Sequence, residues 1–231
     1  FSNEQQLGTV LSKEPEILLG DMEERSLSAV NHLMQWGGMP ELLTLSDNHR
    51  LEWLRSYQQT YLERDLSDLV SLRQLLPFSK LQKLAMLRSG QLLSYSELAR
   101  DAQLSVDTVR RYLAYLEKSY QVLFLEPFHR NLTSRVIKTP KIYWLDLGLL
   151  RQGTGQWSSI TGAMFETLVI SEVHKWFSSR LDNISLSFYR TRSGLEVDLM
   201  IQKADKVTGL EIKNREAISR IDSKNLIKVA D

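Results

Sequence analysis

Apolar and polar side chains alternate most clearly between residues 188 and 213, and this alternation predicts two short strands. Successive side chains on a strand point to opposite faces, so Asp198 in the first strand is expected on the face away from the core. Glu211 and Lys213 take the same outward position in the second strand. The inward-facing set consists of Leu195, Val197, Leu199, Ile201, Leu210 and Ile212. We therefore expect Asp198, Glu211 and Lys213 to meet at one edge of a sheet.

Two carboxylates at one point suit a hard divalent cation. Mg²⁺ prefers oxygen ligands and keeps bound waters, and such a water can attack a phosphodiester. Asp198 and Glu211 are a pair of this kind, and Lys213, two residues beyond Glu211, is placed to orient or polarise the water. The alternative is that residues 211–213 form an ordinary solvated strand face, since polar side chains alternate outward on half-buried strands.

A helix is predicted over residues 161–180, ahead of these strands. Its apolar side chains recur at helical spacing and are Phe165, Leu168, Val169, Val173, Trp176 and Phe177. On a helical wheel Glu166 falls at the margin of this apolar stripe and Glu172 falls inside it. An unpaired buried charge is costly, so a buried carboxylate here needs a partner. A metal ion, or Arg190 and Arg192, can supply it.

The first part of the chain is predicted to be helical. A helix over 23–36 ends at residues 37–40, where two glycines are followed by Met and Pro, because glycine caps a helix and proline does not continue one. A long periodic stretch over 48–70 follows. We expect these helices to pack as one helical unit.

The pattern changes after residue 78 to three short helices and a hairpin. The expected helices cover 80–88, the residues from the Ser94 cap to 101 or 103, and 106–118 after the Ser105 cap; the expected strands cover 121–125 and 142–145. The inward side of the third helix is expected to hold Val106, Val109, Leu113 and Leu116. Helix, turn, helix and hairpin in this order predict a winged helix.

Basic side chains follow two surfaces of this unit. Arg110 and Arg111 lie on the outward side of the third helix, where a recognition helix enters the major groove. The loop between the strands, which in a winged helix neutralises phosphates, carries His129, Arg130, Arg135, Lys138 and Lys141. Arg192 is a further candidate nucleic-acid contact. Asp107 in the leading turn argues against groove binding, and winged helices also bind proteins, so both kinds of partner stay open.

Composition narrows the class of protein. The 231 residues are 42% hydrophobic and 25% charged, as in an ordinary soluble protein. Cysteine is absent, which excludes disulfides and thiolate zinc sites and favours a cytoplasmic location. No apolar run approaches the roughly 18 residues of a spanning helix, so no membrane is expected. Residues 1–78 carry 12 acidic and 6 basic side chains, so any nucleic-acid contact is expected beyond them. The four histidines lack metal-ligand spacing.

The residues from Gly162 to Glu166, then Asp198, then the run Glu211-Ile212-Lys213 resemble the PD-(D/E)xK nuclease signature, with separations similar to those of archaeal Holliday junction resolvases. The resemblance implies an αβββαβ core in which Asp198 and Glu211 bind magnesium, Glu166 holds a metal-bound water and Lys213 positions the nucleophile. Val197 stands where the signature has proline. The chain stops within the expected second helix, so the core is expected to be incomplete.

A second resemblance covers most of the chain. Gly-Gly-x-Pro-Glu at 37–41, Tyr-x-x-x-Tyr-Leu-Glu-Arg-Asp at 57–65 and Lys-x-Tyr-x-x-Asp-x-Gly-Leu at 141–149 resemble the C-terminal portion of a family of prokaryotic AAA+ ATPases with a domain of unknown function. No phosphate loop occurs in these residues, so ATP is expected only through an N-terminal ATPase domain that is not part of this sequence. Phe1 is not expected to be the natural start.

These patterns together predict an α+β multidomain protein. We expect a helical, AAA+ lid-like segment over 1–78, a winged helix over 79–150 and an incomplete nuclease-like domain over 151–231. The expected function is DNA binding with magnesium-dependent phosphodiester hydrolysis, with Glu166, Asp198, Glu211 and Lys213 as catalytic residues. The alternative is a non-catalytic module that binds DNA or a partner protein. The ATPase domain of the same protein is an expected partner, and an oligomer stays open.

Overall fold

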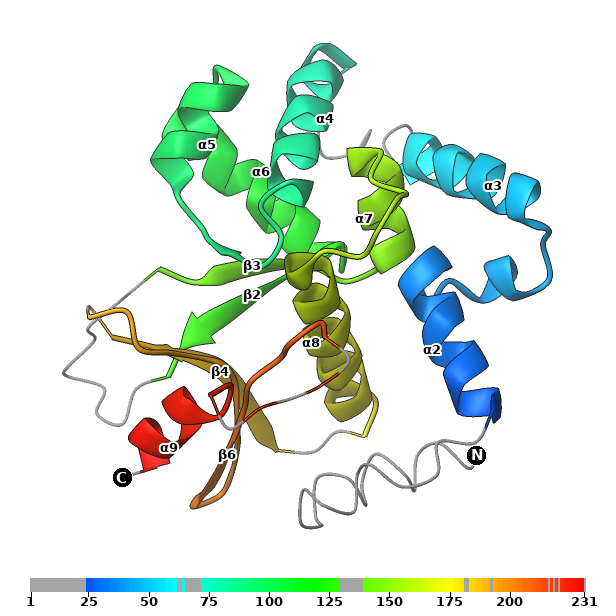
Figure 1. Ribbon diagram of the computed structural model, residues 1–231. Coiled ribbons are helices and arrows are strands. Elements are labelled where there is room, and N and C mark those ends of the chain that lie inside the picture. Colours follow the sequence, from blue (N-terminus) through cyan, green and yellow to red (C-terminus); the bar gives the residue numbers. More distant parts are fainter. Residues whose placement is uncertain are drawn as a thin grey trace.

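The structure is a computed structural model that describes residues 24–61, 64, 72–128, 139–180, 183–191, 193–215, 217, 219 and 221–230. Its helices are α2 (Glu24–Trp36), the 3-10 helix η2 (Pro40–Leu43), α3 (Asp47–Thr60), α4 (Leu72–Met86), α5 (Tyr95–Ala102), α6 (Val106–Lys118), α7 (Leu147–Thr154), α8 (Gly162–Ser179) and α9 (Lys224–Ala230). Its strands are β1 (Gln91–Leu92), β2 (Val122–Pro127), β3 (Lys141–Trp144), β4 (Ile184–Arg190), β5 (Glu196–Lys203) and β6 (Lys206–Leu210). The predicted α+β class is confirmed (Figure 1).

One sheet connects the two halves of the described chain. Its strand order is β1-β3-β2-β4-β5-β6, and all neighbours are antiparallel except β2 and β4. The parallel pair aligns Glu126 with Ser187 and Pro127 with Phe188. A parallel pair needs a long crossover, which here consists of β3, α7 and α8. The sheet therefore continues across the expected domain boundary at 150/151.

Local capping signals account for α5, α6 and α8. Ser94 accepts a hydrogen bond from the Glu97 amide and Ser105 from the Thr108 amide, which satisfies amides that the first helical turn leaves unpaired. Thr161 does the same for α8. All three helices form where the sequence predicts them. Val106 is an exception to the predicted inward face, because it occupies the first turn of α6 and is 39% exposed.

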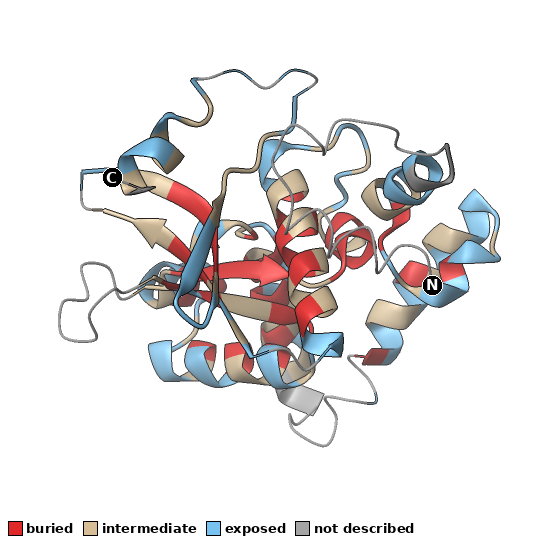
Figure 2. Ribbon diagram, turned by 90° about the horizontal axis from the view of Figure 1, so that it is seen from below, coloured by how far each residue is buried: buried red, intermediate tan, exposed pale blue. Residues whose placement is uncertain are grey.

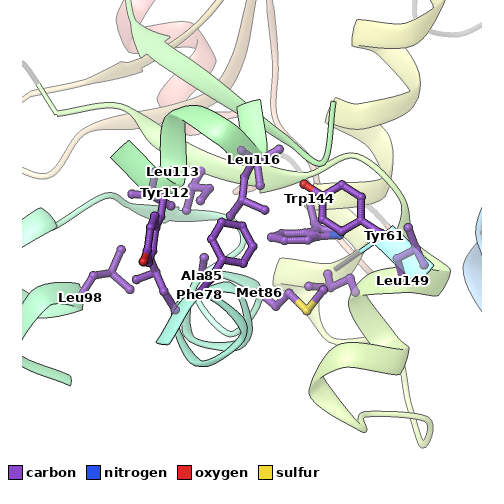
Figure 3. Close-up of a cluster of buried hydrophobic side chains, with 14 of the residues drawn as sticks. Tyr61, Phe78, Ala85, Met86, Leu98, Tyr112, Leu113, Leu116, Trp144 and Leu149 are labelled. Atoms are coloured by element: carbon purple, nitrogen blue, oxygen red, sulfur yellow. The ribbon is translucent and has the colours of Figure 1, made fainter. Parts of the chain in front are cut away.

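Helix α4 begins at Leu72 and not at Lys80, so it crosses the expected boundary at 78/79. It continues through Pro77, and its buried side chains beyond that point recur at helical spacing: Phe78, Leu81, Gln82, Ala85 and Met86. Figure 3 shows Phe78 and Ala85 of this helix near Leu98, Tyr112, Leu113 and Leu116 of α5 and α6, and Met86 toward Trp144 and Leu149. Helix α4 therefore packs mainly with elements of the expected winged-helix unit, although it begins before residue 79. The continuation of α3 predicted up to residue 70 lies largely outside the described residues.

The buried side chains form two clusters. The larger one fills the space among α2, α3, α4, α5, α6 and α7, and the smaller one lies between α8 and strands β2 to β5. Figure 2 shows the buried residues gathered at the centre, with exposed residues on the outer helices. Within the part of the chain that the structure describes, no helix combines the length and hydropathy needed to cross a bilayer.

Strand β5 departs from the predicted alternation because both of its faces are covered. Residues 197–201 are all buried. Leu199 and Ile201 pack in the α8 cluster, whereas Met200 lies on the side covered by α9. A Cβ on Gly209 of the adjacent β6 would lie 3.0 Å from Leu226 of α9 and 3.5 Å from Met200 Sδ. Asp198, predicted to face away from the apolar core, is not a member of the α8 cluster but is nevertheless only 7% exposed.

The turn after α2 is held against the start of α7. Gly37 has φ of +83°, a conformation that favours glycine, and the Gly38 amide donates to Asp146 Oδ2 at 2.8 Å. The other oxygen of Asp146 accepts from the Leu149 amide at 2.9 Å and caps α7. The Gly-Gly-x-Pro-Glu and Asp-x-Gly-Leu patterns therefore meet in one structural junction.

Candidate functional site

The carboxylates of Asp198 and Glu211 and the ammonium group of Lys213 converge next to β5. Lys213 Nζ lies 2.6 Å from Glu211 Oε1 and 3.6 Å from Asp198 Oδ2. Asp198 Oδ2 also accepts the amide of Ile212 at 2.8 Å, which fixes the 211–213 segment beside β5. The structure thus brings together three of the four side chains predicted for catalysis.

The segment that carries Glu211 differs in two respects from its prediction. Strand β6 ends at Leu210, so Glu211 and Lys213 follow the strand instead of continuing it. The Glu211 side chain is only 10% exposed, which rejects the alternative of a solvated strand face. The hydrogen bond from the Ile212 amide to Asp198 Oδ2 takes the place of strand pairing here. It holds the segment that carries Glu211 and Lys213 beside the Asp198 carboxylate.

The protonation equilibria reflect this enclosure. Burial raises the pKa of Glu211, the Lys213 hydrogen bond opposes that shift, and the nearby Asp198 carboxylate adds to it. Burial lowers the pKa of Lys213, but its bond to Glu211 and the charge of Asp198 overcome this and raise the pKa above its ordinary value. Lys213 is therefore held as an ammonium group.

Glu211 Oε2 is a buried oxygen with no hydrogen-bond partner among the described residues. Leaving a buried acceptor unsatisfied costs about 1–3 kcal/mol, and more for a charged group. A cation in contact with this oxygen would remove that cost. A water molecule at this oxygen would satisfy it as well.

Glu166 belongs to an adjoining set of contacts. Its Oε1 accepts from Lys141 Nζ at 3.0 Å and from the Tyr143 hydroxyl at 2.6 Å. A metal ion, or Arg190 and Arg192, was the expected kind of partner for a buried carboxylate on α8; among the described residues Glu166 is bound by Lys141 and Tyr143, both from β3. Glu172, predicted to lie in the buried stripe, is instead half exposed and pairs with Lys175.

Lys141 corrects the prediction that it belongs to an exposed basic loop. Its side chain is 4% exposed, and its Nζ also lies 2.6 Å from Glu196 Oε1. Burial alone would lower the pKa of Lys141, but the Glu166 and Glu196 carboxylates raise it above its ordinary value. Burial and the Glu166 charge raise the pKa of Tyr143, so its hydroxyl stays a donor.

Sequence reasoning missed Lys141, Tyr143 and Glu196 as members of the site. Glu196 begins β5 and also pairs with Arg190 NH1 at 3.1 Å. A usable signal was the Lys-x-Tyr spacing at 141–143, because two residues separated by one position share a strand face. Asp198 and Glu196 both act on Tyr143 electrostatically, and both act on Glu211.

A metal ion would have to use few protein ligands. In the described part of the chain, no group of three His, Cys, Asp or Glu side chains could hold a metal ion. The Asp198 and Glu211 pair, with its unsatisfied oxygen, fits Mg²⁺, which is often bound by one or two carboxylates and otherwise by waters. These two residues are also the ligands that the sequence predicts.

The predicted nucleic-acid contacts are described only in part. Arg110 and Arg111 are exposed on α6, and the Arg110 guanidinium lies 4.2 Å from the centre of the Tyr95 ring. Arg130, Arg135, Lys138 and Arg192 lie outside the described residues.

Family comparisons match two regions of the chain. Residues 27–158 match a family described as Domain of unknown function (DUF8612), and residues 161–231 match one described as Domain of unknown function (DUF4143). Uncharacterized proteins Mb2031c of Mycobacterium bovis and Rv2008c of Mycobacterium tuberculosis are each 32% identical over 197 residues. The alignment covers 80% of this chain and 43% of each relative, so it spans less than half of their length. No solved structure matches the chain significantly.

Proposed function

The chain belongs to the family described as Domain of unknown function (DUF8612), and we propose that it is a DNA-binding module with a magnesium-dependent nuclease-like site. The observation that carries this proposal is the unsatisfied, buried Oε2 of Glu211 beside Asp198 and Lys213. Two carboxylates and a lysine in this arrangement are the groups that metal-assisted hydrolysis of a phosphodiester requires.

The side chains of the site have separate roles in this proposal. Asp198 and Glu211 hold the ion, and Lys213 positions the attacking water through its ammonium group. Bound Mg²⁺ supplies a Lewis acid that lowers the pKa of that water and neutralises phosphate charge. The Ile212 amide keeps Asp198 in place by its 2.8 Å hydrogen bond. Because these groups are largely shielded from water, the effective dielectric constant around them is low, and each of these electrostatic contacts is stronger than it would be in solvent.

The order of elements supports the two-domain part of the proposal. The order α4, β1, α5, α6, β2, β3, with β1 and β2 flanking β3, is that of a winged helix. The order α8, β4, β5, β6, α9 corresponds to the αβββα portion of a PD-(D/E)xK core. We propose Arg110 and Arg111 as DNA contacts and residues before 79 as an AAA+ lid-like segment. The longer protein is proposed to be a cytoplasmic ATPase, in keeping with the lack of cysteine.

The test is cleavage of linear and branched DNA by the 231-residue chain with and without Mg²⁺. Cleavage is expected to require Mg²⁺ and to be abolished in Asp198→Ala and in Lys213→Ala. Lys206→Ala, which removes an exposed charge from β6, serves as the matched control and is expected to cleave normally. Cleavage that survives both site substitutions would rule out this site.

A second candidate function is a non-catalytic module that binds DNA or a protein. The observation that favours it is the pairing of Glu166 with Lys141 and Tyr143, which uses a carboxylate that the nuclease resemblance assigns to catalysis. DNA binding by the unaltered chain without cleavage in Mg²⁺ would favour this alternative.

A further inference from the structure

Lys141 is an enclosed cation between two carboxylates that come from different elements. Its Nζ contacts Glu166 of α8 at 3.0 Å and Glu196 of β5 at 2.6 Å. Lysine is almost never fully buried unless it is paired, because removing an ammonium group from water is costly. The two contacts offset this cost and also fix both carboxylates.

The four carboxylates near β5 fall into two pairs with different surroundings. Glu166 has a second donor in the Tyr143 hydroxyl, and Glu196 has a second cation in Arg190. Their charges are thus balanced by groups of the chain itself. Glu211, by contrast, keeps an oxygen without a partner, and Asp198 lies 3.6 Å from the Lys213 ammonium group. The pair formed by Asp198 and Glu211 is the one that can accept an added cation.

The net charge of this cluster indicates how many divalent ions it can hold. Glu166, Glu196, Asp198 and Glu211, together with Lys141, Arg190 and Lys213, carry a formal charge of −1. One divalent ion changes this to +1, and a second would change it to +3 in a largely enclosed volume. Repulsion between like charges grows as the effective dielectric constant falls. One divalent ion is therefore favoured over two.

We propose that Lys141 is a positioning residue that takes the place of a second divalent cation, so that the site binds one Mg²⁺ at Asp198 and Glu211 and Glu166 is not a ligand. This inference rests on the ion site of the proposed function. It adds to that function a stoichiometry and a role for a residue from the DUF8612 region of the chain. Glu166 then acts on the site through Lys141 and Tyr143.

The test is Mn²⁺ binding to the 231-residue chain, with free Mn²⁺ followed by electron paramagnetic resonance. One ion per chain is expected. Asp198→Asn and Glu211→Gln are expected to weaken binding by at least about tenfold, as is common for groups that hold a metal. Glu166→Gln, which removes a charge of the cluster but no ligand, is expected to weaken binding much less than either of these substitutions and to keep one ion. Glu172→Gln, the matched control elsewhere on α8, is expected to leave the affinity unchanged.

Substitution of Lys141 gives the second measurement. Lys141→Arg is expected to keep one ion, and Lys141→Met is expected to gain a weaker second ion that is absent in Lys141→Met combined with Glu166→Gln. If Lys141→Met does not fold, the inference is decided by the number of Mn²⁺ ions bound to the unaltered chain and to Glu166→Gln. Two ions in the unaltered chain, or a lost ion in Glu166→Gln, would overturn this inference alone. No Mn²⁺ binding at all would overturn the proposed ion site together with it.

Discussion

The carbonyl group of Trp36 and the α-carbon of Gly148 are in direct contact. A Cβ built on Gly148 would lie 1.9 Å from the Trp36 oxygen, closer than any side chain could approach. Trp36 ends α2, and Gly148 is in the first turn of α7. The C-terminal end of α2 therefore lies against backbone at a position where a side chain larger than glycine's would clash.

Gly148→Ala is expected to destabilise the chain by more than about 2 kcal/mol, since the clash is with backbone and neither helix can shift without disturbing the core. The measurement is the free energy of unfolding in urea. Gly162→Ala is the matched control, because Gly162 begins α8 and nothing lies within 4 Å of its added Cβ. That variant is expected to be neutral or slightly stabilised. Equal effects of the two substitutions would contradict the contact.

Tyr143→Phe is expected to lower the free energy of unfolding by about 1.5–3 kcal/mol, the range for a hydrogen bond to a charged group. The substitution removes one of the two donors to Glu166 Oε1 and leaves Lys141 in place. Tyr120→Phe is the control, because Tyr120 is 80% exposed and should change stability by less than about 0.5 kcal/mol. A Tyr143→Phe protein as stable as the control would show that this hydroxyl contributes nothing.

His174 gives an expected pH dependence. Its pKa is lowered from the ordinary value of 6.5 by burial first and by Lys175 second, so the folded chain favours the neutral ring. Between the lowered pKa and 6.5 the unfolded chain binds more protons, so stability is lost as pH falls below about 6.5. The free energy of unfolding in urea should fall less between pH 7.5 and pH 5.5 for His174→Gln than for the unaltered chain. An identical loss in both proteins would assign the dependence to other groups.

The elements with local signals were predictable from the sequence. Helices α5, α6 and α8 have a serine or threonine cap followed by apolar side chains at helical spacing, and both features lie within a few residues of each other. The strand that carries Asp198 was also predictable, because its apolar and polar side chains alternate over neighbouring residues. The meeting of Asp198, Glu211 and Lys213 was predictable because Glu211 directly follows β6, which is the next strand in the sequence after β5 and pairs with it.

The features that depend on distant segments were not predictable. Lys141 follows a basic stretch and could be recognised as buried only if its partners on α8 and β5 were known. The enclosure of β5 depends on α9, whose packing against Gly209 no local pattern indicates. Helix α4 begins at Leu72, ahead of the predicted residue 80, and its buried side chains from Phe78 onward pack in the larger cluster with α5 and α6.

The last prediction concerns DNA binding through α6. Replacing both Arg110 and Arg111 with Gln removes two exposed positive charges from one helix face. Each phosphate contact releases counterions, with a slope of about 0.9 in a plot of log affinity against log salt concentration. The double variant is therefore expected to bind duplex DNA more weakly and to have a salt slope smaller by about 2. Fluorescence anisotropy at several salt concentrations measures both quantities.

The matched control replaces Lys224 and Lys228 of α9 with Gln, because this pair also removes two exposed charges. Figure 1 shows α9 on the far side of the sheet strands from α5. If contact is made by α6, the control retains the slope of the unaltered chain, since net charge alone acts weakly beyond a Debye length of about 10 Å. Equal losses in the two double variants would instead indicate a response to net charge, and Arg110 and Arg111 would then be surface residues available for a protein partner.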